Sequence, residues 1–330
     1  MVDVFSSPPV QSTRAPYVSN YRYKLLNPET NKPETWTRVT TFAKTLADTS
    51  ALSAWAERML VKGLAMQPGL LRGAEAWDVS EHKGAFSKLI NEAKDVAGIK
   101  DGATAGTRMH DLTEAHDRGE ELLFATPEEL RDIQAYQQAL SGAGLRVYRE
   151  YIERFVAVPE FKVCGKLDRI YGVPSAPELS DYALQIGDVK TAKNVHYGWL
   201  EIVIQLALYS MATHYWDDEK DDWVPMPDVS RDLAQVAHLP VGAGECTIYE
   251  VDLEAGRAAC DLARSVRAMR ALKDLARPVS SSRIESPYAA RLRAAGTRDE
   301  LSALWKEATA AGAWTTDLEM IGMSRLKELS

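Results

Sequence analysis

Apolar residues recur every three or four positions through the first part of the chain, which is the spacing of one face of a helix. One such segment opens with Thr126, Pro127 and two acidic residues. This is a composition that suits a helix N-terminus. The helices that we predict on this basis cover residues 37–63, with a loop-prone break at 48–50, and residues 86–96, 102–119 and 126–143.

The pattern then changes to the β-branched and aromatic content that is typical of strands. Residues 145–158, 161–173 and 182–191 predict three consecutive strands, and residues 236–239 and 246–251 predict a hairpin. Helical spacing returns at residues 197–216 and 253–275. This order predicts an α/β fold with an αβββαβ mixed sheet that carries helices on its faces.

The same pattern suggests three regions. We predict an N-terminal arm and helical region at residues 1–100, an α/β core at 101–277, and a linker with a small helical tail at 278–330. Residues 1–20 are rich in Ser, Pro and Val and are expected to form a flexible arm or an edge segment. The tail is read as a helical hairpin that packs on the core or docks a recombination partner, and its apolar residues include Leu301, Trp305, Trp314 and Leu318.

Composition narrows the class of protein. Apolar residues make up 45% of the chain and charged residues 26%, which is typical of a soluble globular protein. The chain has neither a long apolar run nor the features of a secretory signal, so we expect a cytoplasmic protein with no membrane contact. Cys164, Cys246 and Cys260 are widely spaced, which argues against a disulfide framework and a zinc ribbon and favours buried free thiols.

The net charge of −8 argues against a protein that coats nucleic acid through a uniformly basic surface. A local basic groove would still be enough for DNA contact. Residues 257–293 hold nine basic and three acidic residues. This excess fits either a solvated helix face or a contact with DNA. The basic residues are Arg257, Arg264, Arg267, Arg270, Lys273, Arg277, Arg283, Arg291 and Arg293.

The strongest chemical signal is Asp168 followed, 20 residues later, by the sequence Asp188-Val189-Lys190. Residues two apart in a strand point to the same face, so Asp188 and Lys190 are expected to project together. If Asp168 lies on the neighbouring strand, the two carboxylates converge into an oxygen-rich site for Mg²⁺ or Mn²⁺. Such a metal with a nearby ammonium suits phosphodiester cleavage. The alternative is an ordinary surface ion pair on a strand edge.

Further residues occur in an order that resembles the RecB-like branch of the PD-(D/E)XK nucleases. A glycine-led helix carries His110, the first predicted strand carries Glu153, and the second carries the Gly165-x-x-Asp168 motif. The third strand carries residues 188–191, and the next helix carries a Gln-x-x-x-Tyr pair. By motif the resemblance covers roughly a third of the chain, and it implies a restriction-endonuclease-like core at residues 101–277.

The resemblance also implies a role for each matching residue. It assigns Asp168, Asp188, Lys190 and Glu153 to catalysis. His110 and the backbone carbonyl of Val189 would join the two aspartates as metal ligands, whereas Thr191, Gln205 and Tyr209 would contact DNA.

Two departures from the pattern of the RecB-like nucleases narrow the subtype of nuclease that the chain resembles. Three dispersed cysteines cannot build the four-cysteine iron–sulfur cluster of several relatives, and no Walker A motif is present. The chain therefore resembles stand-alone phage-type exonucleases, which would act in the host cytoplasm if phage-encoded.

The function that we expect is metal-dependent exonuclease activity on double-stranded DNA ends, in recombination, repair or phage replication. A recombinase or single-strand annealing protein would be a natural partner, and a homo-oligomer is compatible with such an enzyme. The alternatives are a non-catalytic DNA-binding or assembly protein with the same fold, a structure-specific endonuclease, and an enzyme that acts on RNA.

Overall fold

The computed structural model describes residues 15–19, 22–174, 182–196, 198–273, 275–277 and 285–329. The chain divides into two compact units, residues 1–271 and 272–330. The boundary lies close to the predicted start of the tail. Residues 1–100 belong to the same unit as the predicted core.

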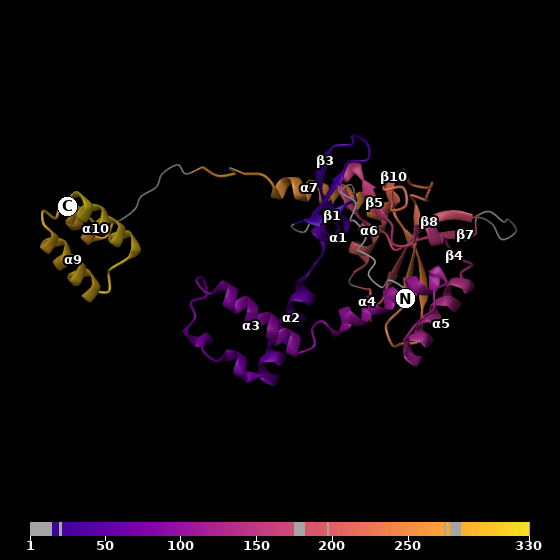
Figure 1. The fold of residues 1–330 in the computed structure, drawn as a ribbon, viewed down its shortest axis with the longest axis horizontal. Coiled ribbons are helices and arrows are strands. Elements are labelled where there is room, and N and C mark those ends of the chain that lie inside the picture. Colours follow the sequence, from indigo (N-terminus) through magenta and orange to yellow (C-terminus); the bar gives the residue numbers. More distant parts are fainter. Residues whose placement is uncertain are drawn as a thin grey trace, which may run out of the picture. The chain divides into compact units, whose positions relative to one another are not determined.

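The first unit has a mixed α/β architecture with two β-sheets (Figure 1). In the seven-stranded sheet all neighbours are antiparallel except β3 and β6, which are parallel. In sheet order its strands are β1 (Tyr17–Ser19), β2 (Arg22–Leu26), β3 (Pro33–Arg38), β6 (Val163–Lys166), β5 (Phe155–Val158), β9 (His214–Asp217) and β10 (Asp222–Pro225).

The five-stranded sheet is also mixed. Its strands β8 and β11 are parallel, and every other pair of neighbours is antiparallel. In sheet order the strands are β12 (Thr247–Asp252), β11 (Leu233–His238), β8 (Tyr182–Lys190), β7 (Arg169–Pro174) and β4 (Arg146–Val147). The predicted hairpin of residues 236–239 and 246–251 is confirmed as β11 and β12.

The first two predicted strands are wrong in one respect, because each is divided between the two sheets. The segment 161–173 becomes β6 and β7, and the segment 145–158 becomes β4 and β5. At the crossing point the backbone N–H of Leu167 donates to Arg154 O, and that of Glu153 donates to Asp168 O. An antiparallel pair of segments thus bends from one sheet into the other, and Glu153 lies outside any strand at a φ of 56°.

Five strands that the apolar pattern did not predict complete the seven-stranded sheet. Strand β1 is an edge strand and lies in segment 1–20, which is predicted to form a flexible arm or an edge segment. Strand β2 follows this segment, β3 overlaps the start of the predicted helix 37–63, and β9 lies at the end of the predicted helix 197–216. Strand β10 follows the acidic turn after β9. Strands β3 and β9 connect this group to the rest of the sheet by pairing with the distant strands β6 and β5. Such tertiary pairing overrides local preference.

The helices agree more closely with the pattern. The predicted helical segment 37–63 is interrupted at residues 47–49, close to its predicted break at 48–50. Thr126 caps the N-terminus of α5 in a reciprocal arrangement with Glu129, as the opening residues of that segment suggested. None of the described helices is long and apolar enough to cross a membrane. The α-helices of this unit are α1 (Val39–Ala43), α2 (Ser50–Met66), α3 (Lys83–Val96), α4 (Asp101–Arg118), α5 (Pro127–Gly142), α6 (Trp199–Ser210) and α7 (Glu254–Arg270). Short 3-10 helices are η1 (Lys44–Leu46), η2 (Pro68–Leu71), η3 (Ala74–Ala76), η4 (Arg149–Tyr151) and η5 (Pro159–Phe161).

Two hydrophobic clusters hold the five-stranded sheet between helices. On one face, Ile170 and Ile186 pack with Leu208 of α6 in a cluster that also includes residues of α1 and α7. On the other face, Tyr171 and Val189 pack with residues of α4 and α5. Each fully buried aliphatic side chain contributes about 1.5–3 kcal/mol, so the sheet that carries β8 is anchored on both faces.

The second unit contains three helices where a two-helix hairpin was predicted. Helices α8 (Pro287–Ala294), α9 (Arg298–Ala310) and α10 (Thr316–Glu328) pack around Leu292, Leu301 and Leu318. Side chains of Ser286, Thr297 and Thr315 cap the three N-termini. This unit therefore has a small core of its own.

Candidate active site

Asp168 lies where the chain leaves β6 and enters β7, at the crossing between the two sheets. Its Oδ2 accepts a hydrogen bond of 3.1 Å from the backbone N–H of Val189 on β8. The last paired residues at this end of β7 and β8 are Arg169 and Gly187, so Asp168 lies just beyond the paired strands. The Asp168 side chain thus replaces a strand partner at this point and is held beside the segment that carries Asp188 and Lys190.

Asp188 and Lys190 lie on the same face of β8, as predicted from their spacing. Lys190 Nζ is 2.6 Å from Asp188 Oδ2, and Gln205 Nε2 of α6 donates to Oδ1 at 3.4 Å. The Asp188 side chain is only 2% exposed, so the pair is not a surface ion pair. Burial raises the pKa of Asp188, and the charge of Lys190 opposes this increase.

His110 approaches Asp168 from the third turn of α4, with Nδ1 3.8 Å from Oδ2. Burial lowers the pKa of His110 and outweighs the opposing charge of Asp168, which favours the neutral imidazole that can act as a metal ligand. The absence of a side chain at Gly106 permits this approach, because a Cβ there would lie only 2.8 Å from Thr191 Oγ1. Gly106 therefore lets α4 pack against the end of β8.

Glu153 lies beside the same crossing. Its Oε2 is 3.8 Å from Lys166 Nζ, and its backbone N–H donates to Asp168 O at 3.1 Å. Burial, followed by the charges of Asp168 and Glu114, raises the pKa of Glu153 to about 7. The left-handed backbone of this non-glycine residue costs about 1–2 kcal/mol, so surrounding contacts must hold it in place.

Gln205 and Tyr209 lie one turn apart on α6. One of them contacts β8 and the other contacts β6. Gln205 binds Asp188, while the Tyr209 hydroxyl donates to Lys166 O at 2.6 Å. Both side chains are buried in this arrangement, and Gly165 leaves room for the Tyr209 ring. Their observed contacts position the strands, and direct contact with DNA stays a prediction.

Sequence analysis missed a buried polar network behind Asp168. Arg169 is fully buried and donates to Asp117, to Thr113 and to the backbone oxygen of Asp168. The Tyr136 hydroxyl donates to the same Asp117 carboxylate. A signal was present, because Thr113 and Asp117 follow His110 at three and seven positions, which places them along one side of α4.

A cleft of about 740 Å³ opens beside His110. Its walls are the N-terminal half of α4 and the segment after β8 with Thr191 and Lys193. Of the predicted site residues, His110 and Thr191 line this cleft, whereas Asp168, Asp188 and Lys190 do not.

The expected divalent cation requires side-chain atoms that are available to bind it. Asp188 Oδ2 is buried and accepts no aligned hydrogen bond, although the Lys190 ammonium lies near it. Among the described residues, no group of three or more His, Cys, Asp or Glu side chains is arranged to hold a metal ion, and all three cysteines are free thiols. The described side chains thus bring two carboxylates and an imidazole near one another without forming a metal-binding group. The buried Asp188 oxygen without a hydrogen bond is the feature that favours a cation here.

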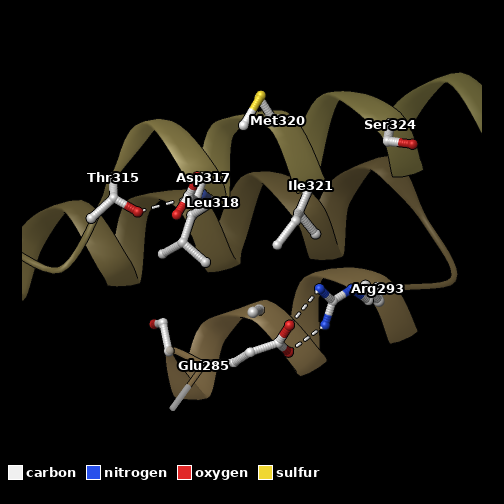
Figure 2. Close-up of a pocket in the computed structure, with 10 residues that line it drawn as sticks. Glu285, Arg293, Thr315, Asp317, Leu318, Met320, Ile321 and Ser324 are labelled. Carbon is white, nitrogen blue, oxygen red and sulfur yellow. Dashed lines mark hydrogen bonds and ion pairs between the residues drawn. The ribbon is translucent and has the colours of Figure 1, made fainter. Parts of the chain in front are cut away.

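A second hollow, of about 500 Å³, lies in the C-terminal unit between α8 and α10 (Figure 2). Glu285 and Arg293 form a two-pronged ion pair at its edge, with distances of 2.6 and 2.9 Å. Leu318 and Ile321 supply apolar lining. None of the predicted site residues takes part in this hollow.

Comparisons with known proteins add no relative. No model of a protein family matches the chain, and no curated protein matches it. The geometry and chemistry of its own residues therefore carry the functional argument.

Proposed function

We propose that the protein is a metal-dependent deoxyribonuclease with a restriction-endonuclease-like core. One observation carries the proposal. Asp168 reaches across from the end of one strand to the backbone of Val189, so that its carboxylate lies beside the buried Asp188 and Lys190. Two carboxylates and an ammonium in one sheltered place suit phosphodiester hydrolysis better than an exposed ion pair does.

The order of elements supports the core assignment. In chain order, helices α4 and α5 are followed by β4, β7 and β8 of the five-stranded sheet, then by α6 and β11. This is the αβββαβ order that the resemblance implies, with the proposed site at the ends of β7 and β8. Strands β5 and β6, which belong to the seven-stranded sheet, lie between β4 and β7 in the chain.

Each residue is proposed to act through the atoms that it presents. Asp168 and Asp188 would hold Mg²⁺ or Mn²⁺, with His110 and the Val189 carbonyl as further ligands. The bound cation would neutralise charge on the phosphoryl oxygens and activate a water. Lys190 would orient that water or the scissile phosphate. Burial lowers the pKa of Lys190, but the negative charge of Asp188 outweighs burial and raises this pKa, so that the ammonium stays protonated. Glu153, with its raised pKa, is suited to exchange a proton at the rim.

The substrate is proposed to be double-stranded DNA entered from an end. The cleft beside Thr191 and Lys193 offers a path for one strand, and Gln205 and Tyr209 would support the strand near the scissile phosphate. Exonuclease action in recombination, repair or phage replication, with a recombinase or single-strand annealing partner and a homo-oligomeric ring, rests on resemblance alone.

The proposal is tested by digestion of end-labelled linear duplex DNA in Mg²⁺ or Mn²⁺. Asp188→Asn and Lys190→Ala should each lower the cleavage rate by at least a hundredfold, the scale of removing one charge-stabilising group. Matched controls come from the exposed pair Asp95 and Lys100, which are 2.7 Å apart. Asp95→Asn and Lys100→Ala should retain the wild-type rate.

The outcomes separate the alternatives. Cleavage of linear but not closed circular DNA supports an exonuclease, whereas cleavage of both indicates an endonuclease. Cleavage confined to an RNA duplex would show that the substrate is RNA and not DNA. A folded wild-type protein that binds DNA but cuts none of these substrates in either metal would refute the enzymatic proposal and leave a DNA-binding protein.

A further inference from the structure

The basic residues of α7 fall into two groups in the structure. Arg257 pairs with Asp232 at 3.3 Å, and Arg264 pairs with Asp261 at 2.6 Å. Arg267 and Arg270, in the last turn of the same helix, form no ion pair with any described carboxylate. The local excess of positive charge noted in the sequence is therefore concentrated at the C-terminal end of α7.

A third arginine from a distant segment joins these two. Arg22 of β2 lies directly opposite Thr37 of β3 in the sheet register, and Arg267 Nη2 donates to Thr37 Oγ1 at 3.3 Å. Arg22 and Arg267 therefore meet at one threonine, and Arg270 lies one helical turn further on the same face. Arg22 also has no ion-pair partner in the part of the chain that the structure describes.

The Arg267 guanidinium is held in place before any ligand arrives. It lies over the Phe42 ring at 5.5 Å from the centroid and is fixed from the side by Thr37. Burial, then the charges of Arg22 and Arg270, lowers the pKa of Arg267. Its positive charge is thus destabilised by its surroundings, and an anion would relieve this strain. A fixed guanidinium also loses less conformational entropy on binding than a free one.

A structural explanation accounts for only part of this arrangement. Cationic residues stabilise the C-terminal end of a helix through its dipole, which explains Arg267 and Arg270. It does not explain Arg22, which lies on a strand and adds a third like charge.

We propose that Arg22, Arg267 and Arg270 form a phosphate-binding patch for the backbone of a nucleic acid, apart from the cleavage site. Guanidinium groups match phosphate oxygens in geometry as well as charge. The residues after Thr37 connect the patch to the candidate site, because Val39 lies against Gly165, three residues before Asp168. The choice of nucleic acid over another polyanion rests on the proposed function.

The test measures binding of a labelled DNA duplex to the full chain in EDTA, over a series of salt concentrations. Each phosphate contact that is lost should reduce the slope of log K against log salt by about 0.9. Arg22→Gln/Arg267→Gln/Arg270→Gln should therefore flatten the slope by about 2–3. The single change Arg270→Gln, at an exposed helix end, should flatten it by about 1 without affecting the fold. The matched control is Arg257→Gln, which removes a paired arginine from the same helix and should leave the slope nearly unchanged.

The result is independent of cleavage. Slopes of the triple and single variants equal to wild type would overturn the patch even if the protein cuts DNA. Flattened slopes would support it even if no cleavage is found. The assignment would also be overturned if the wild type does not bind DNA. It would equally be overturned if the triple variant loses binding to anionic lipid vesicles while its DNA binding is unchanged.

Discussion

Arg169 and Asp117 form a fully buried ion pair in which Arg169 Nε donates to Asp117 Oδ2 at 2.6 Å. Arg169 also donates to the backbone oxygen of Asp168 at 2.8 Å. The pair therefore connects α4 to the chain crossing that places the first carboxylate of the candidate site. This buried ion pair therefore fixes the backbone at Asp168.

Removing one member of this pair should be costly. Asp117→Ala leaves the Arg169 charge buried without its carboxylate, a change that destabilises proteins by about 3–5 kcal/mol. Urea denaturation should show this loss, while Asp95→Ala, at an exposed pair, should cost about 1 kcal/mol or less. Equal losses in the two variants would contradict the structural role assigned to Asp117.

The Tyr209 hydroxyl offers a milder test of the same crossing. Tyr209→Phe removes its hydrogen bond to Lys166 O and should lower the free energy of unfolding by about 1 kcal/mol. On the proposed function, cleavage should fall while the chain remains folded. Tyr151→Phe is the control, since the Tyr151 hydroxyl makes no hydrogen bond within the described chain. A Tyr209→Phe variant identical to wild type in both assays would remove Tyr209 from the site.

Two glycines should respond to alanine with opposite signs. A Cβ on Gly63 of α2 would overlap the carbonyl oxygen of Ala93 on α3, whereas a Cβ on Gly84 would meet nothing within 4 Å. Gly63→Ala should destabilise the protein by about 2 kcal/mol or more because the helices must move apart. Gly84→Ala should be neutral or stabilise it by up to about 1 kcal/mol through helix propensity. Thermal melting of both variants measures the contrast.

Glu34 should make folding stability depend on acid pH. Hydrogen bonds from Asn27, then Trp36 and Lys162, lower the pKa of Glu34 to about 2. Because the folded pKa lies below the unfolded one, this contribution is present above about pH 4.5 and is lost as the pH falls toward 2. Solvent screening reduces it to about 1–2 kcal/mol.

Denaturation of wild type and Glu34→Gln measures that contribution. The advantage of the wild type should be largest near pH 6 and should shrink steadily below pH 4.5. A constant difference across this range would show that the lowered pKa of Glu34 does not contribute.

Local sequence was sufficient for several features. The helical spacing and the capping residues located α4 and α5, because helix N-termini and apolar faces are set by residues within a few positions. The i, i+2 spacing of Asp188 and Lys190 placed their side chains together, since strand geometry alternates the faces. Assignment to a nuclease family came from motif order and stays a prediction.

Only the tertiary structure decided where the candidate site lies and what holds it. The crossing at Leu167 and Asp168 depends on pairing partners far away in the chain, so continuous apolar segments were read as single strands. The pairing of β3 with β6, the buried Arg169–Asp117 pair and the contact between Thr37 and Arg267 likewise join segments that are distant in sequence. The two side-chain contacts span 52 and 230 residues. Residue type and spacing determine local geometry, but the choice among distant partners is made by the packing of the whole unit.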